Sequence, residues 1–61
     1  MQGDTLHLLI IDDDTMLRRN ISVYFEDSGF LVTQACNGTE GIELFSQNQP
    51  DIVIVDLIMP D

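Results

Sequence analysis

Two short apolar segments are each followed directly by acidic residues. Residues 8–11 (Leu-Leu-Ile-Ile) lead into Asp12, Asp13 and Asp14, and residues 52–55 (Ile-Val-Ile-Val) lead into Asp56. Apolar runs of this length are typical of strands that are buried on both faces of a parallel sheet. Because neighbouring parallel strands end on the same side, the acids are expected to meet at one edge. In open α/β sheets that edge binds ligands.

The segment after the first strand, which we expect over residues 6–11, shows helical spacing. Asp14 or Thr15 is suited to begin a helix, and Gly29 to end it. One face of this helix is expected to carry the residues Leu17, Ile21, Tyr24, Phe25 and Ser28.

The second half of the chain repeats this alternation. Residues 31–35 mix polar and apolar positions, as a strand nearer a sheet edge does. Asn37 and Glu40 have capping-box spacing at a helix start, and the helix should end near Gln47 or Asn48, before Pro50. Its apolar face is formed by Ile42, Leu44 and Phe45. A last strand, residues 52–55, precedes a loop.

The predicted order is therefore strand, helix, strand, helix, strand. Right-handed crossovers place the two most apolar strands side by side and the mixed strand outside the first, which gives the parallel order 2-1-3 with one helix on each face. This is an α/β three-layer sandwich, and its strand order begins that of flavodoxin-like folds. Asp12, Asp13 and Asp56 should converge at the point where the strand order reverses.

Composition narrows the class of protein. The 61 residues carry eleven acids against Arg18 and Arg19, a net charge of −9 that disfavours nucleic acids and anionic lipid surfaces as partners of this segment. Cys36 is the only cysteine, so an internal disulfide is impossible and a reducing compartment fits. No secretion signal or membrane span is visible, and we expect a cytoplasmic location.

The acids allow more than one interpretation. Asp12, Asp13 and Asp14 are favourable at a helix N-terminus, but one acid suffices as a cap. Carboxylates converging at a sheet edge are also the ligands that Mg²⁺ prefers, often together with a phosphate. A carboxylate beside such a cation can act as a nucleophile toward phosphorus and form an aspartyl phosphate.

Four stretches of the chain carry a family resemblance. They are residues 8–14 (LLIIDDD), 28–30 (SGF), 35–41 (ACNGTEG) and 50–61 (PDIVIVDLIMPD). Together they resemble the receiver domain of two-component response regulators, in register over nearly the whole chain. Such a domain has about twice this length, so residues 1–61 are expected to be its N-terminal half.

The resemblance implies roles for particular residues. Asp56 corresponds to the phosphoacceptor, and Asp12 and Asp13 correspond to the acidic pair that holds Mg²⁺. Ile58 corresponds to the position whose backbone carbonyl also binds the metal, and Gly41 stands where many relatives carry alanine. The implied partner is a histidine kinase or a phosphotransfer protein.

The resemblance also implies what a receiver domain adds later in its chain. A hydroxyl residue and a lysine contact the phosphoryl group, and this chain has no lysine. We therefore expect residues 1–61 to be incomplete for switching. A receiver domain assists its own phosphorylation and dephosphorylation but is not a conventional enzyme.

Two other functions are compatible with the acids. An aspartyl-phosphate phosphohydrolase commonly needs a second aspartate two residues after its nucleophile, where this chain has Ile58. An inert structural or oligomerising fragment would pair its exposed third strand with that of a second copy. We expect no function from the remaining reactive side chains. His7, Arg18 and Arg19 should face solvent, and Cys36 should be a small apolar residue near the end of the second strand.

Overall fold

Strands and helices alternate along residues 5–56, the part of the chain that the computed structural model describes. The elements are β1 (His7–Ile11), α1 (Thr15–Asp27), β2 (Leu31–Ala35), α2 (Gly38–Asn48) and β3 (Ile52–Val55). The predicted order and bounds are confirmed, except that β1 begins at His7, one residue later than expected.

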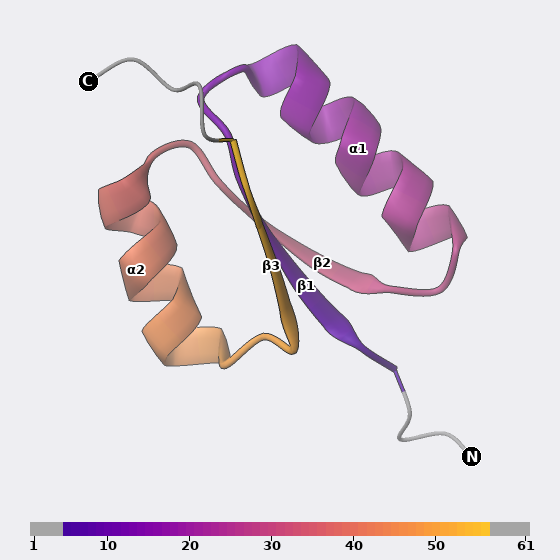
Figure 1. Ribbon diagram of the computed structural model, residues 1–61. Helices are drawn as coiled ribbons and strands as arrows, with labels where there is room; N and C mark the ends of the chain where they lie inside the picture. The colour runs from indigo at the N-terminus through magenta and orange to yellow at the C-terminus, as the bar shows by residue number, and fades with distance from the viewer. Residues whose placement is uncertain (1–4, 57–61) are drawn as a thin grey trace.

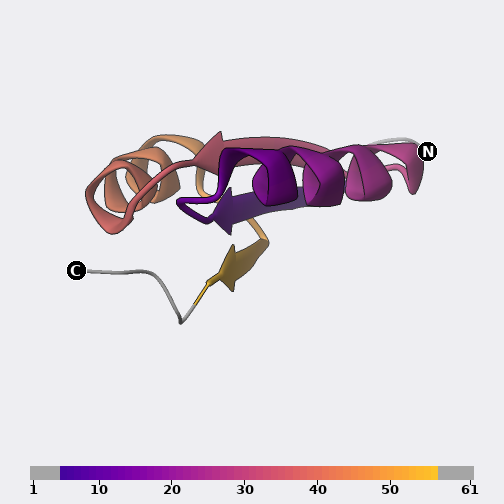
Figure 2. The same ribbon diagram turned by 90° about the horizontal axis from the view of Figure 1, so that it is seen from above.

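β1 is the central strand of a three-stranded parallel sheet with the order β2-β1-β3. Leu8 pairs with Val32 on one side and with Ile52 on the other. The side chains of Leu8, Leu9 and Ile10 are each only 1% exposed, so the apolar run is buried on both faces as predicted. In Figure 2 the arrowheads of the three strands point the same way, which brings their carboxyl ends to one edge.

The two helices lie on opposite sides of the sheet and complete three layers (Figure 1). Both pack against β1 and β2, and within residues 5–56 neither packs against β3. The apolar side chains of β3 are therefore half exposed, with Val53 at 39% and Val55 at 44%. Burial on both faces, which the sequence predicted for both apolar runs, holds for β1 but not for β3 within this part of the chain.

α1 begins and ends where the sequence indicates. The Asp14 carboxylate accepts a hydrogen bond from the Leu17 N–H at 3.1 Å, which caps the helix. After the C-cap Ser28, Gly29 has a φ of 100°, a left-handed conformation that glycine adopts without steric cost.

The buried face of α1 differs from the predicted one. Ser22 is 1% exposed, whereas Leu17 and Tyr24 are 46% and 66% exposed. Leu17 lies toward β3, over which no helix packs within the described residues. The small Ser22 side chain lets α1 lie close to the sheet, and its hydroxyl donates to the Arg18 carbonyl at 2.8 Å.

α2 is capped by Asn37, whose side-chain oxygen accepts from the Glu40 N–H at 2.8 Å. Glu40 reaches back as predicted, but it accepts from the Cys36 N–H rather than from Asn37. Gly41 is buried against β1: a Cβ atom there would overlap Ile11 Cδ1 and lie 2.9 Å from Ile11 Cγ1. Glycine therefore permits the close approach of α2 to Ile11.

The expectations for His7 and Cys36 were wrong. His7 is half-buried, because its ring Nε2 and the Thr33 hydroxyl form a 2.6 Å hydrogen bond between β1 and β2. Cys36 is exposed rather than packed, because it lies in the turn after β2. In the described residues no helix is both long and apolar enough to cross a membrane.

The fit between Gly41 and Ile11 predicts that the two positions are energetically coupled. Gly41→Ala gains up to about 1 kcal/mol of helix propensity. Overpacking against Ile11 costs about 1–3 kcal/mol, so we expect net destabilisation. Ile11→Val removes the overlapping methyl group and should cost less stability in the Gly41→Ala background than in the wild type. Denaturant unfolding of the wild type, the two single variants and the double variant measures the coupling. Additive effects within about 0.5 kcal/mol would contradict it.

The outer edge of β3 predicts self-association of the 61-residue chain. Half-exposed apolar side chains on an edge strand favour pairing with a second copy. Sedimentation should give a mass that rises with concentration, or a partly unfolded chain. Val53→Lys should suppress the association, whereas Val23→Lys, which charges the exposed face of α1, should not. A compact monomer at every concentration would show that this edge does not drive pairing.

Candidate functional site

The site is built where β1 and β3 end. The Asp12 N–H donates to the Ala35 carbonyl at 3.1 Å, and the Asp56 N–H donates to the Ile11 carbonyl at 3.0 Å. Both aspartates thus continue the parallel hydrogen-bonding pattern by one residue beyond the strands. Their positions are fixed by the sheet rather than by a loop.

Three carboxylates converge at this edge. Asp12, Asp13 and Asp56 each offer an oxygen, and these oxygens lie within 4.8 Å of one another. Asp12 is buried, Asp56 is half-buried and Asp13 is exposed. Oxygen donors at this spacing, open to solvent on one side, fit a hard divalent cation such as Mg²⁺, which binds one or two carboxylates and keeps several waters.

Asp14 has a different role from its two neighbours, as the sequence predicted. Its side chain caps α1, and its N–H donates to Asp12 Oδ1 at 2.9 Å. This hydrogen bond orients the Asp12 carboxylate and offsets part of its charge. The run of three acids therefore divides into two members of the carboxylate cluster and one helix cap.

A cavity of about 500 Å³ opens beside the cluster, between α1 and β3. Its lining combines the acids with apolar side chains of both elements, among them Leu17, Ile21 and Ile54.

Comparison with known proteins agrees with this geometry. The response regulator receiver domain matches residues 8–61. The chain belongs to this family. It shares 37% identity over 58 residues with the transcriptional regulatory protein CseB of Streptomyces avermitilis. It shares 42% over 53 residues with the DNA-binding dual master transcriptional regulator RpaA of Synechocystis sp..

These alignments cover most of this chain but little of the relatives. They span 95% and 87% of the chain, and 25% and 22% of CseB and RpaA. A nitrate/nitrite response regulator protein homolog of Haemophilus influenzae is 41% identical over 92% of the chain and 28% of its own length. The chain thus spans about a quarter of these relatives. Membership of the receiver family implies two-component phosphoacceptor signalling, and receiver domains typically bind Mg²⁺.

One predicted site residue lies outside the described residues. This is Ile58, whose backbone carbonyl the resemblance assigns to the metal. Asp12, Asp13 and Asp56, which the resemblance assigns to the receiver site, are the residues that the structure brings together.

The sequence interpretation missed Arg18. Instead of facing solvent, its guanidinium donates from Nη1 to the Asp12 carbonyl at 2.7 Å and from Nε to Gln34 Oε1 at 3.0 Å. No local signal distinguishes Arg18 from the adjacent and exposed Arg19, because the partners of Arg18 lie on β2 and directly after β1.

The turn after β2 lies near the same edge. The Cys36 N–H lowers the pKa of Glu40 by donating to its carboxylate at 2.7 Å. A hydrogen bond with Glu40 raises the pKa of the Cys36 thiol, so at neutral pH the thiol is protonated and weakly nucleophilic. Cys36 thus adds no reactive group to the site.

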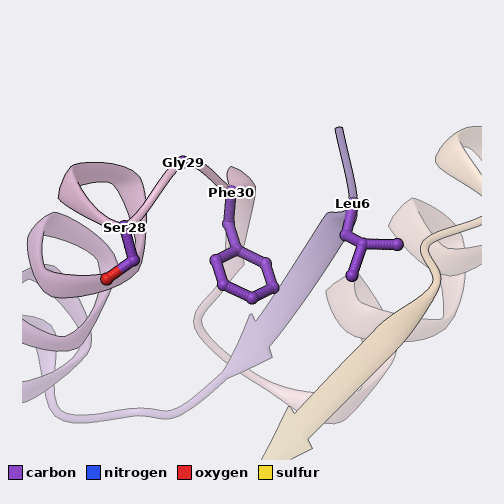
Figure 3. A pocket seen from close by; sticks show the side chains of 4 residues that line it. All are labelled: Leu6, Ser28, Gly29 and Phe30. Carbon is purple, nitrogen blue, oxygen red and sulfur yellow. The ribbon is translucent and has the colours of Figure 1, made fainter. Parts of the chain in front are cut away.

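A second pocket, of about 170 Å³, lies at the turn between α1 and β2. Leu6, Ser28, Gly29 and Phe30 line it, and in Figure 3 the Phe30 ring lies between the turn and Leu6. None of these four side chains carries a charge. The pocket contains none of the predicted site residues.

We expect Mg²⁺ to bind weakly at the three carboxylates. In an NMR titration the amide signals of Asp13 and Asp56 should shift first, because these residues surround the bound charge. Asp13→Asn should weaken binding strongly. Glu43→Gln, which removes an exposed acid of α2, should leave it unchanged. Shifts confined to Glu40 or Glu43 would contradict the assignment.

Proposed function

We propose that Asp56 is the phosphoacceptor of a two-component receiver domain, with the phosphoryl group supplied by a histidine kinase or a phosphotransfer protein. The observation that carries the proposal is the convergence of Asp56 with Asp12 and Asp13 at the end of the central strand. Membership of the receiver family supports it.

The chemistry is the transfer of a phosphoryl group from a histidine nitrogen to a carboxylate oxygen of Asp56. An Asp56 carboxylate oxygen attacks the phosphorus of a phosphohistidine in line with the leaving nitrogen. A phosphorus–oxygen bond forms, the phosphorus–nitrogen bond breaks, and the imidazole keeps the bonding electrons and takes a proton. The product is an acyl phosphate on Asp56.

Asp12 and Asp13 would hold Mg²⁺ beside the reacting carboxylate. When bound, the cation offsets the negative charge that accumulates on the transferring phosphoryl oxygens. The protein contributes by fixing the carboxylates beforehand. Asp12 is held by its own N–H, by the Asp14 N–H and by Arg18. Fixed carboxylates reduce the reorganisation needed during transfer.

We further propose that residues 1–61 supply the N-terminal half of the receiver domain. The resemblance implies a lysine and a hydroxyl residue that contact the phosphoryl group, and residues 1–61 contain no lysine. On this proposal these contacts, and the conformational switch that depends on them, belong to the second half. Asp56 and the acid pair belong to the first.

Substitution of Asp56 tests the proposal. In the full-length protein, Asp56→Asn preserves the size of the side chain but removes the nucleophilic anion, so labelling by radioactive acetyl phosphate or by a phosphorylated kinase should be lost. Asp27→Asn, at the exposed end of α1, removes an equal charge away from the site and should be labelled like the wild type. Full labelling of the Asp56 variant would disprove the assignment.

A further inference from the structure

We propose that Arg18 is a positioning residue for the acid pair, and that it sets the affinity of the site for a divalent cation. This inference rests on the proposed function of Asp12 and Asp13. Arg18 spans three elements: it belongs to α1, it donates to the carbonyl that follows β1, and it donates to Gln34 of β2. Its guanidinium joins these elements where the carboxylates converge.

The carbonyl that Arg18 binds lies in the peptide unit that links Asp12 to Asp13. A peptide unit is planar, so fixing the direction of its carbonyl also fixes the N–H and the Cα of the next residue. Asp13 is exposed, so packing does little to hold it. The 2.7 Å hydrogen bond from the guanidinium therefore limits the rotation of the peptide unit that carries Asp13.

Arg18 adds a constraint that the other contacts of Asp12 do not supply. The Ala35 carbonyl holds the Asp12 N–H, and the Asp14 N–H holds Asp12 Oδ1. Neither contact fixes the carbonyl. The guanidinium contact is also charge-assisted, and such hydrogen bonds are roughly twice as strong as neutral ones.

Both the backbone of Arg18 and its guanidinium have further contacts. The Arg18 N–H donates to the Asp14 carbonyl at 2.9 Å, and the buried Ser22 hydroxyl donates to the Arg18 carbonyl at 2.8 Å. Gln34 Oε1 accepts a hydrogen bond from the guanidinium Nε at 3.0 Å, which fixes that side of the planar group. Two donors at fixed directions suit arginine, whereas the ammonium of lysine has no such planar fork.

The charge of Arg18 and its positioning role predict opposite effects on cation affinity when the residue is replaced. A positive charge near the site repels a divalent cation, so by charge alone the loss of Arg18 should tighten binding. If Arg18 positions the acid pair, its loss should weaken binding instead. Arg19 is the matched control, because it carries the same charge one residue later and is exposed.

The experiment measures Mg²⁺ affinity by NMR titration of the full-length protein. Arg18→Ala should weaken binding about tenfold, as the loss of a residue that orients metal ligands commonly does. Arg18→Lys, which keeps the charge and one donor, should bind with intermediate affinity. Gln34→Ala should cause a smaller loss, and Arg19→Ala should bind as tightly as the wild type or more tightly.

NMR spectra recorded without Mg²⁺ distinguish a positioning role of Arg18 from an overall loss of stability. The amide signals of Asp13 and Asp14 should shift or broaden in Arg18→Ala, while those of α2 and β3 stay in place. Arg19→Ala should leave all of these signals unchanged. Should Arg18→Ala fail to fold, Arg18→Lys and Gln34→Ala test the same contacts.

The outcomes separate this inference from the proposed function. A wild-type protein that binds no Mg²⁺, or binding that survives Asp13→Asn, would overturn both. Binding that is lost in Asp13→Asn but is unchanged or tighter in Arg18→Ala would overturn the positioning role alone. Unchanged affinity in both Arg18→Lys and Gln34→Ala would also overturn it.

Discussion

The fold and the site both depend on the pairing of β1 with a parallel strand on each side. Its apolar run can be buried because both of its edges are occupied, and its side chains meet a helix on each face of the sheet. The same pairing sets the register in which β1 and β3 end. Asp12 and Asp56 extend that register by one residue through hydrogen bonds to Ala35 and Ile11. The convergence of the carboxylates is therefore a consequence of strand pairing.

The cost of this arrangement is electrostatic. Like charges held close together repel, and the chain carries a net charge of −9 that adds to the repulsion. The structure offsets part of this with local dipoles and one cation: the Asp14 N–H lies against the Asp12 carboxylate, and Arg18 lies against the Asp12 carbonyl. A bound divalent cation would offset more. On the proposed function, the acid cluster therefore serves a ligand rather than the stability of the fold.

The sequence predicted most of the backbone and the convergence of Asp12, Asp13 and Asp56. Apolar runs bounded by acids identify β1 and β3, and capping residues identify the helix starts at Asp14 and Asn37, because these signals are local. The interactions that it missed join segments far apart in the chain. Periodicity on one helix could not show that Arg18 would reach Gln34, or that His7 would pair with Thr33 across two strands. The buried face of α1 was misjudged for the same reason, since Ser22 is buried by its position over the sheet.

The end of β1 is constrained from both faces of the sheet, which explains how a short strand can hold a site. On one face, Ile11 occupies the space above Gly41, so α2 packs closely against the last residue of the strand. From the other helix, Arg18 binds the carbonyl of Asp12, the next residue along the chain. Successive side chains of a strand point to opposite faces, so α1 and α2 can each act on this segment without competing for space. Rigid support on both sides is what a cluster of carboxylates requires, because small displacements change the distances between charges and therefore the affinity for a cation.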